Sequence, residues 1–271
     1  MKLQNKTIIV TGGGNGLGRE LVLNLLKRGN NVIAFDINEA ALRETSQLAG
    51  KKSTALATMM LDITDKEAIY KSVEKSIAMF GQVDGIINNA GIIQPFKKLI
   101  DTDFSIMTKV VEINFGGTMY MIKAFLPHLL TRPEAHIVNI SSMGGFLPVP
   151  GQAIYGASKA AVKMMSECLN SELLETNVRV TIVSPGAIFT NIKSNSGLGK
   201  EDGINANEYE SAPRGVLLPS VAAELIAKGV ERNKVRIYIG KDSKFMNFLY
   251  HISPDFACNL IYKKIKENHN L

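Results

Sequence analysis

The chain has 271 residues, a formal net charge of +6, 45% hydrophobic residues and 21% charged residues. This balance is typical of a soluble globular protein and excludes a disordered, collagen-like or coiled-coil chain. The length suits one large domain or two small ones. The two cysteines, Cys168 and Cys258, lie far apart, and the four histidines form no zinc motif. We therefore expect neither a disulfide nor a metal site.

The excess positive charge is spread along the chain. Lysines occur in pairs, such as Lys51-Lys52 and Lys97-Lys98, and never in a run of five or six. A nucleic-acid partner is therefore not expected. Residues 1–6 lead into only a short apolar run, unlike a signal peptide. Because no stretch of about 18 apolar residues occurs either, we expect a cytoplasmic protein with reduced thiols.

Short apolar runs alternate with longer amphipathic stretches along the chain. The apolar runs predict strands at 7–11, 31–37, 55–63, 83–88, 137–140, 178–183 and 235–239. The amphipathic stretches predict helices at 17–27, 66–80, 103–130, 155–175 and 219–232. Continuously apolar strands joined by helices are typical of a parallel sheet that is covered on both faces. We expect a single doubly wound α/β domain of six or seven strands over residues 1–240.

Two segments interrupt this alternation. Residues 189–215 are polar and contain glycines, as a substrate-binding loop often does. Residues 241–271 form a C-terminal tail with five lysines and three acidic residues. One predicted helical face of the tail gathers four apolar side chains, Phe245, Phe248, Leu249 and Ile252. Pro254 would end that helix. The tail either covers its own or a neighbouring subunit, or binds the surface of an anionic membrane as a peripheral contact.

A glycine-rich segment, residues 11–18 (TGGGNGLG), connects the first predicted strand to the first predicted helix. Glycines there let the backbone turn tightly and approach a pyrophosphate, which the helix N-terminus attracts. The segment does not match GxGxxG, and it is no P-loop because Arg19-Glu20 replaces Lys-Ser/Thr. It does match GxxxGxG through Gly12, Gly16 and Gly18.

Asp36 lies at the end of the second predicted strand, 20 residues after Gly16. A carboxylate at this position can accept hydrogen bonds from both hydroxyls of an adenosine ribose, and it repels a 2′-phosphate. Asn38 is available for the alternative role of helix N-cap. Because no Arg or Lys flanks Asp36, the sequence favours NAD over NADP.

Tyr155 and Lys159 are four residues apart on a predicted helix and share one face. The spacing alone is a weak signal, since Tyr262 and Lys266 repeat it. The first pair differs because Ser142, at the end of a predicted strand, lies 13 residues before Tyr155. Ser141 is the alternative serine.

These three side chains suit the oxidation of an alcohol. When a nicotinamide takes hydride from the carbinol carbon, a base must take the hydroxyl proton. Tyrosine ionises near pH 10, which is too high for a base at neutral pH. A neighbouring ammonium and an oxidised nicotinamide both favour phenolate. We therefore expect a lowered pKa for Tyr155, with Lys159 as its activator and Ser142 orienting the substrate oxygen.

Over residues 5–240 the chain resembles the short-chain dehydrogenases/reductases. The resemblance depends on several motifs in the family's order and spacing: the glycine segment at 11–18, Asp36, Asp62, NNAG at 88–91, Asn114, NISS at 139–142, Tyr155 with Lys159, and Pro185-Gly186 followed by Thr190. No residue of the family's catalytic set is missing.

The resemblance implies a role for each matching residue. Contacts with the pyrophosphate would come from the glycine segment, namely Gly12, Asn15, Gly16, Leu17 and Gly18. Contacts with the adenosine would come from Asp36, Ile37, Asp62 and Ile63. The middle of the cofactor would lie along Asn89, Ala90 and Gly91. Its nicotinamide half would meet Tyr155, Lys159, Pro185, Gly186, Ile188 and Thr190. Asn114 would hold a water that connects Lys159 to solvent.

We therefore expect an NAD-dependent oxidoreductase that acts on a secondary alcohol or ketone. One alternative is an NADPH-dependent 3-oxoacyl-thioester reductase, which Asp36 disfavours. The other is a non-catalytic NAD-binding scaffold, which the presence of both Tyr155 and Lys159 disfavours. The resemblance also implies a homodimer or homotetramer that packs through the helices near 103–130 and 155–175.

The expected substrate pocket consists of Gln94, residues 143–151 and the loop after Thr190. Several side chains in this set are large and apolar, namely Met143, Phe146, Leu147 and Val149. They favour an apolar substrate such as a lipid, terpenoid or sterol-like alcohol.

Overall fold

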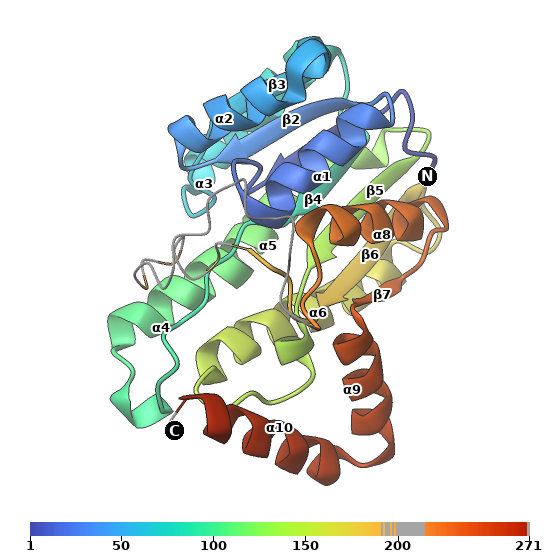
Figure 1. The fold of residues 1–271 in the computed structure, drawn as a ribbon. Helices are drawn as coiled ribbons and strands as arrows, with labels where there is room; N and C mark the ends of the chain where they lie inside the picture. The colour runs from blue at the N-terminus through green and yellow to red at the C-terminus, as the bar shows by residue number, and fades with distance from the viewer. Residues whose placement is uncertain (191, 193–195, 197, 199–214, 270–271) are drawn as a thin grey trace.

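The computed structural model describes residues 1–190, 192, 196, 198 and 215–269, so most of the expected loop at 189–215 lies outside the described residues. Seven parallel strands form one sheet in the order β3-β2-β1-β4-β5-β6-β7 (Figure 1). In chain order the strands are β1 Thr7–Thr11, β2 Asn31–Asp36, β3 Leu56–Met60, β4 Gly85–Asn88, β5 Ala135–Ile140, β6 Val178–Pro185 and β7 Arg236–Ile239. The expected doubly wound parallel sheet is confirmed.

The strand order reverses between β1 and β4. From β1 the chain proceeds outward through β2 to β3, and then returns to the other side of β1 to form β4. The loops that follow β1 and β4 therefore lead away from each other and leave a crevice at the carboxyl edge of the sheet. Ligands of open α/β sheets bind in such a crevice.

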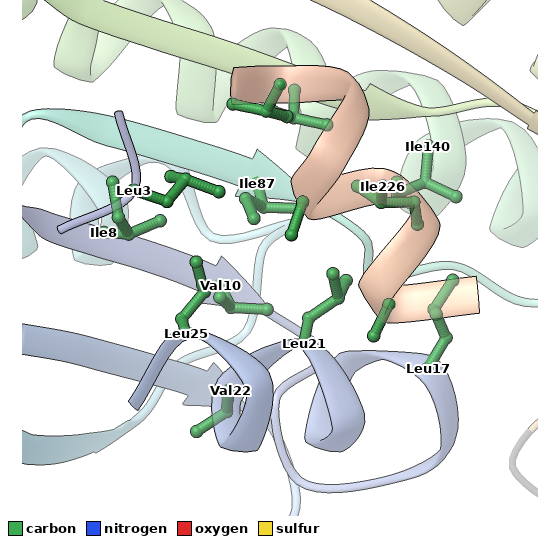
Figure 2. Close-up of a cluster of buried hydrophobic side chains, with 14 of the residues drawn as sticks. Leu3, Ile8, Val10, Leu17, Leu21, Val22, Leu25, Ile87, Ile140 and Ile226 are labelled. Atoms are coloured by element: carbon green, nitrogen blue, oxygen red, sulfur yellow. The ribbon is translucent and has the colours of Figure 1, made fainter. Parts of the chain in front are cut away.

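Helices cover both faces of the sheet. One face carries α1 Gly16–Lys27, α2 Glu39–Ala49 and α8 Pro219–Glu231, whereas the other carries α3 Lys66–Phe80, α5 Thr118–Leu130 and α6 Ala153–Glu172. Side chains of β1 alternate between the two cores, with Ile8 and Val10 on the first face and Ile9 on the second. Figure 2 shows Leu21 of α1 and Ile226 of α8 in the first core, and both are almost fully buried.

Two helical segments differ from the prediction. Helix α2 was not predicted, because Leu42 and Leu48 are its only large apolar residues and only Leu42 and Thr45 are buried. The expected helix at 103–130 is divided into α4 Phe104–Val111, a π-helical turn at Glu112–Gly117, and α5. Turns of this kind insert an extra residue and occur frequently at functional sites.

The tail forms two helices, α9 Lys241–Ile252 and α10 Pro254–His269, and Pro254 begins the second. Both pack on the segment that follows β5, where fully buried Leu147 contacts a small core with Met246, Ala257 and Ile261. None of the helices that the structure describes is both long and apolar enough to cross a membrane.

The buried face of α9 is not the predicted one. Its inward residues are Met246, Leu249 and Tyr250, whereas Phe245, Phe248 and Ile252 are 56%, 63% and 66% exposed. Of the four residues predicted to share the apolar face, only Leu249 packs inward, and the other three side chains are exposed to solvent.

Candidate active site

A cleft of about 530 Å³ opens at the carboxyl edge of the sheet, within the size range of ligand pockets. It is lined by the loops after β1, β2, β3, β4, β5 and β6 and by the start of α6. The expected residues that line it are Gly12, Asn15, Gly16, Leu17, Asp36, Ile37, Asp62, Ile63, Asn89, Ala90, Gly91, Ser142, Tyr155, Lys159, Pro185, Gly186, Ile188 and Thr190. Gly18 and Asn114 do not line it.

The glycine segment forms the wall at the N-terminus of α1. Gly12 and Gly16 adopt φ values of +68° and +51°, which side chains with a Cβ rarely tolerate. A Cβ on Gly16 would lie 3.4 Å from Thr190 across the cleft and would narrow it. Gly18 acts behind this wall, because a Cβ there would collide with the carbonyl oxygen of Gly12. Gly18 thus allows close packing of α1 on the loop, and its expected contact with the pyrophosphate stays a prediction.

Asp36 orders the edge of the cleft beside this loop. Its Oδ2 accepts the N–H of Gly14 and its Oδ1 accepts the N–H of Asn38, both at 2.9 Å. Asn38 in turn caps α2 by accepting the N–H of Ala41. Each carboxylate oxygen can accept a further hydrogen bond, so Asp36 can bind ribose hydroxyls while it holds the loop.

Arg19, at the start of α1, is already held by groups of the protein. The guanidinium of Arg19 donates to both carboxylate oxygens of Glu44 and to the carbonyl of Gly14. Among the described residues that line the cleft, Lys159 is the only cation. A 2′-phosphate beside Asp36 would therefore meet a carboxylate without a positive partner from this lining.

The segment after β4, residues 89–94, approaches the centre of the cleft and is called the strap below. The Thr11 hydroxyl accepts the N–H groups of Asn89 and Ala90, both at 3.0 Å, and Asn89 Nδ2 donates to the Thr11 carbonyl. A Cβ on Gly91 would lie 3.0 Å from Asn114 Oδ1 and 3.1 Å from Lys159 Nζ. Only glycine lets the strap pass this close to both groups.

Helix α6 brings Tyr155 and Lys159 to the opposite wall. The Tyr155 hydroxyl is hydrogen-bonded to Ser142, and the Ser142 hydroxyl also accepts the N–H of Gly144 at 3.1 Å. Lys159 Nζ lies 6.0 Å from the centre of the Tyr155 ring and donates to the carbonyl of Ile140 at 3.0 Å. Ser141 donates to the carbonyl of Lys159 at 2.8 Å, so the geometry gives Ser142 the position beside Tyr155.

Burial dominates the ionisation of this pair. It lowers the pKa of Lys159 from 10.5 to about 8. It also raises the pKa of Tyr155 above its usual value, although the hydrogen bond with Ser142 acts in the opposite direction. The expected lowering of the Tyr155 pKa is therefore wrong for the protein alone. The desolvation of the phenolate outweighs any stabilisation that the chain itself supplies.

Asn114 lies on the π-helical turn and is fully buried. Its Oδ1 accepts the N–H of Ile92 at 2.8 Å, and its Nδ2 donates to the carbonyl of Ile92 and to the hydroxyl of Ser158. Both amide hydrogens are therefore used within the protein. A water bound by this side chain could only donate to its Oδ1, so the expected water relay stays a prediction.

The sequence prediction missed part of the lining and assigned other residues wrongly to the pocket. The missed side chains include Ile92, Ile93, Ile113, Ile140 and Ser141. The position of Ile92 and Ile93 directly after Gly91 was a usable signal. Conversely, neither Gln94 nor any residue of 143–151 lines the cleft. Gln94 is fully buried and hydrogen-bonded to α6. Leu147 is fully buried in the small core under the tail, and Met143, Phe146 and Val149 pack against the same core, so the apolar side chains from which the substrate was predicted lie outside the cleft.

The residues present fit a nicotinamide dinucleotide. A glycine segment exposes the backbone at the start of α1 for a pyrophosphate, and Asp36 lies where an adenosine ribose would bind. Within the described parts of the chain, no group of three His, Cys, Asp or Glu side chains could hold a metal ion.

Comparison with known proteins agrees with this geometry. Residues 6–201 match the family model of the short chain dehydrogenases. The SadH protein of Mycobacterium tuberculosis is 33% identical over 253 residues, which are 92% of this chain and 91% of that protein. The chain belongs to the short-chain dehydrogenase family. It is therefore an oxidoreductase of this family, whose cofactor class is NAD or NADP.

Solved structures of the family share the fold. A short-chain dehydrogenase from Burkholderia cenocepacia in complex with NADP superposes with a TM-score of 0.80 at 24% identity, covering 96% of this chain and 99% of that one. A relative from Burkholderia phymatum in complex with NAD gives 0.78 at 23% identity, covering 88% and 90%. Neighbours of the same fold thus bind either cofactor.

The burial of Lys159 predicts a stability cost with a defined pH dependence. In the unfolded chain lysine keeps its proton up to its ordinary pKa of 10.5, whereas in the folded protein it loses it near 8. Between these values the unfolded state binds more protons, so the Lys159 contribution to stability rises with pH. We expect Lys159→Met to be more stable than the wild type near pH 7, and this advantage of about 3 kcal/mol to shrink toward about pH 10.

The measurement is urea unfolding of both proteins across this pH range. Lys123→Met, at an exposed position of α5, is the matched control and should follow the wild type. Parallel pH curves for wild type and Lys159→Met would contradict the burial argument.

Proposed function

We propose that the protein transfers hydride between NAD(H) and a secondary alcohol or ketone, with Tyr155 as the acid/base. The observation that carries the proposal is the Tyr155 hydroxyl, which is hydrogen-bonded to Ser142 and faces a cleft that Lys159 also lines. The nicotinamide supplies or accepts the hydride when it is bound. Ser142 and Tyr155 together bind the substrate oxygen.

The proton is moved by the chain's own groups. Tyr155 takes the hydroxyl proton in oxidation and returns it in reduction. Because burial raises its pKa, Tyr155 keeps its proton in the free protein. It becomes a base only when positive charge is placed beside it. Removal of the proton therefore depends on oxidised cofactor being bound in the cleft. Lys159 holds the ribose side of the cleft and adds positive charge near the phenolate.

The first test replaces Tyr155 with Phe, which keeps the ring and removes the transferable proton. We expect NAD binding to persist and turnover to fall by about 10²–10⁴-fold. Oxidation of 2-butanol, 2-octanol and cyclohexanol with NAD supplies the assay. Tyr262→Phe is the matched control, because Tyr262 has the same spacing to Lys266 but lies on α10. Retention of more than about a tenth of the rate in Tyr155→Phe would reject the assignment.

The proposed cofactor is NAD and not NADP. Support comes from Asp36 beside the adenosine position and from the ion pair of Arg19 with Glu44, which keeps that cation from a 2′-phosphate. The NADPH-dependent thioester reductase would need a positive partner that the described lining lacks near Asp36. A non-catalytic scaffold would need neither Tyr155 nor Lys159.

Asp36→Asn tests the cofactor assignment. The amide keeps one oxygen acceptor for the glycine loop and removes the charge. We expect kcat/KM with NAD to fall about tenfold and kcat/KM with NADP to rise, because a hydrogen bond to a charged group is lost and a repulsion is relieved. If the wild type already prefers NADP, Asp36 does not select the cofactor.

The proposed substrate is apolar. The described lining of the cleft contains Ile92, Ile93 and Ile192, whose side chains cannot hydrogen-bond to a polar substrate. The order of kcat/KM in the alcohol panel tests this, since 2-octanol should exceed 2-butanol.

We also place the protein in the cytoplasm as a homodimer or homotetramer. The exposed apolar side chains of the helices expected at the interface support the assembly, in particular Phe104, Val111, Met119 and Met164.

The tail is proposed to rest on an anionic lipid surface. Beyond the residues that pack inward, α9 exposes Phe245, Phe248 and Ile252 together with Lys241 and Lys244. Helix α10 exposes Phe256 and Leu260 together with Lys263 and Lys264. Apolar groups flanked by lysines complement anionic headgroups. A second copy of the same surface would bring like charges together, so the lipid is the better partner.

Vesicle pelleting tests this contact. The wild type should pellet with phosphatidylglycerol vesicles and not with phosphatidylcholine vesicles, and Phe245→Ser/Phe248→Ser should stay in solution. Met60→Ser is the matched control, because Met60 is 64% exposed on β3, away from the tail and from the helices expected at the interface. Failure of the wild type to pellet would reject the proposal. A changed sedimentation coefficient of the double variant would instead identify a second copy as the occupant.

A further inference from the structure

Gln94 lies at the end of the strap, next to the start of α6, and it is fully buried. Its Oε1 accepts the N–H groups of Ile154 and Tyr155 at 2.9 and 3.0 Å. Its Nε2 donates to the carbonyl of Gly151 at 3.2 Å. One buried amide thus contacts the backbone of Tyr155 without lining the cleft.

Helix α6 needs this contact because it has no N-cap of its own. The residue at the N-cap position is Gln152, and its side chain makes no capping hydrogen bond. The first N–H groups of a helix lack partners within the helix and must find them elsewhere. Gln94 supplies an acceptor from a distant part of the chain. Gln152 turns the other way and donates to the backbone carbonyl of Gln94 at 2.9 Å.

The strap that carries Gln94 is itself held at the site. Ile92, two residues earlier, exchanges two hydrogen bonds with the side chain of Asn114. Gly91 passes next to Lys159 Nζ. The strap therefore meets α6 at two places. Gly91 lies beside Lys159, and Gln94 is bonded directly to the backbone of Tyr155 in the first turn.

We propose that Gln94 is a positioning residue for Tyr155. Its amide sets the position of the first turn of α6 and so keeps the Tyr155 hydroxyl on Ser142. Glutamine also leaves the site uncharged, whereas a carboxylate at this place would oppose the phenolate. The inference rests on the proposed role of Tyr155 as the base.

Two substitutions separate position from charge. Gln94→Met has a similar shape but accepts no N–H, so kcat should fall about tenfold or more at every pH. Gln94→Glu keeps the acceptor and adds a negative charge, so the rise of kcat/KM with pH should move upward by about one pH unit. Gln152→Met is the matched control, because it removes a bond to the same strap without touching Tyr155.

The assay uses NAD and the alcohol that the wild type oxidises fastest among 2-butanol, 2-octanol and cyclohexanol. Rates are expressed per active site, with the number of sites determined by NADH fluorescence titration. The chain has no tryptophan, so no tryptophan emission overlaps the NADH signal. The ultraviolet absorbance of phenolate, taken as the difference between each protein and its Tyr155→Phe counterpart with NAD bound, follows Tyr155 without any substrate. Melting temperatures report the folding of each variant.

The results for these variants support or overturn the inference as follows. A lower kcat for Gln94→Met, an upward shift for Gln94→Glu and an unshifted profile for Gln152→Met support the inference. Equal rates and profiles in all variants overturn it, as does a kcat loss for Gln152→Met that matches that of Gln94→Met. If Tyr155→Phe stays active in the same assay, the proposed base has failed, whereas an inactive Tyr155→Phe beside unaffected Gln94 variants rejects Gln94 alone.

Discussion

The reversal of strand order between β1 and β4 is the constraint on which the site depends. Two parallel neighbours send their following loops in opposite directions, so the sheet leaves a crevice at its carboxyl edge. The Thr11 hydroxyl fixes the geometry there by accepting two N–H groups from the start of the strap. The glycine segment, the strap and α6 all take their positions from this edge.

Burial of two side chains at that crevice, Tyr155 and Lys159, determines their ionisation. Desolvation lowers the pKa of Lys159 and raises the pKa of Tyr155, so it favours the neutral form of each. The fold thereby maintains an unfavourable environment for charge, which a bound cationic ring would relieve. A site of this kind makes the fold less stable than an apolar one would.

The strap after β4 connects features that look independent along the chain. It contacts the glycine segment through Asn89, the π-helical turn through Ile92 and α6 through Gln94. A shift in any one of these contacts would therefore reach the others. The tail forms a separate layer over the segment after β5, where it buries Leu147 and presents a second apolar surface outward.

The sequence by itself determined the sheet, the family and somewhat more than half of the cleft lining. These depend on local patterns: an apolar run makes a strand, a glycine run makes a turn, and a residue after a strand lies at the sheet edge. Gly18 does not line the cleft, and spacing does not tell whether a missing Cβ serves a ligand or a neighbouring carbonyl.

Only the tertiary structure decided the ionisation of Tyr155, the role of Gln94 and the outward face of α9. Each depends on groups that are distant in sequence. Desolvation sums over every atom around a hydroxyl, the partners of Gln94 lie about sixty positions away, and the buried face of α9 is chosen by Leu147 and its neighbours. A pattern within one helix cannot contain that information, because the surface that selects its face belongs to another part of the chain.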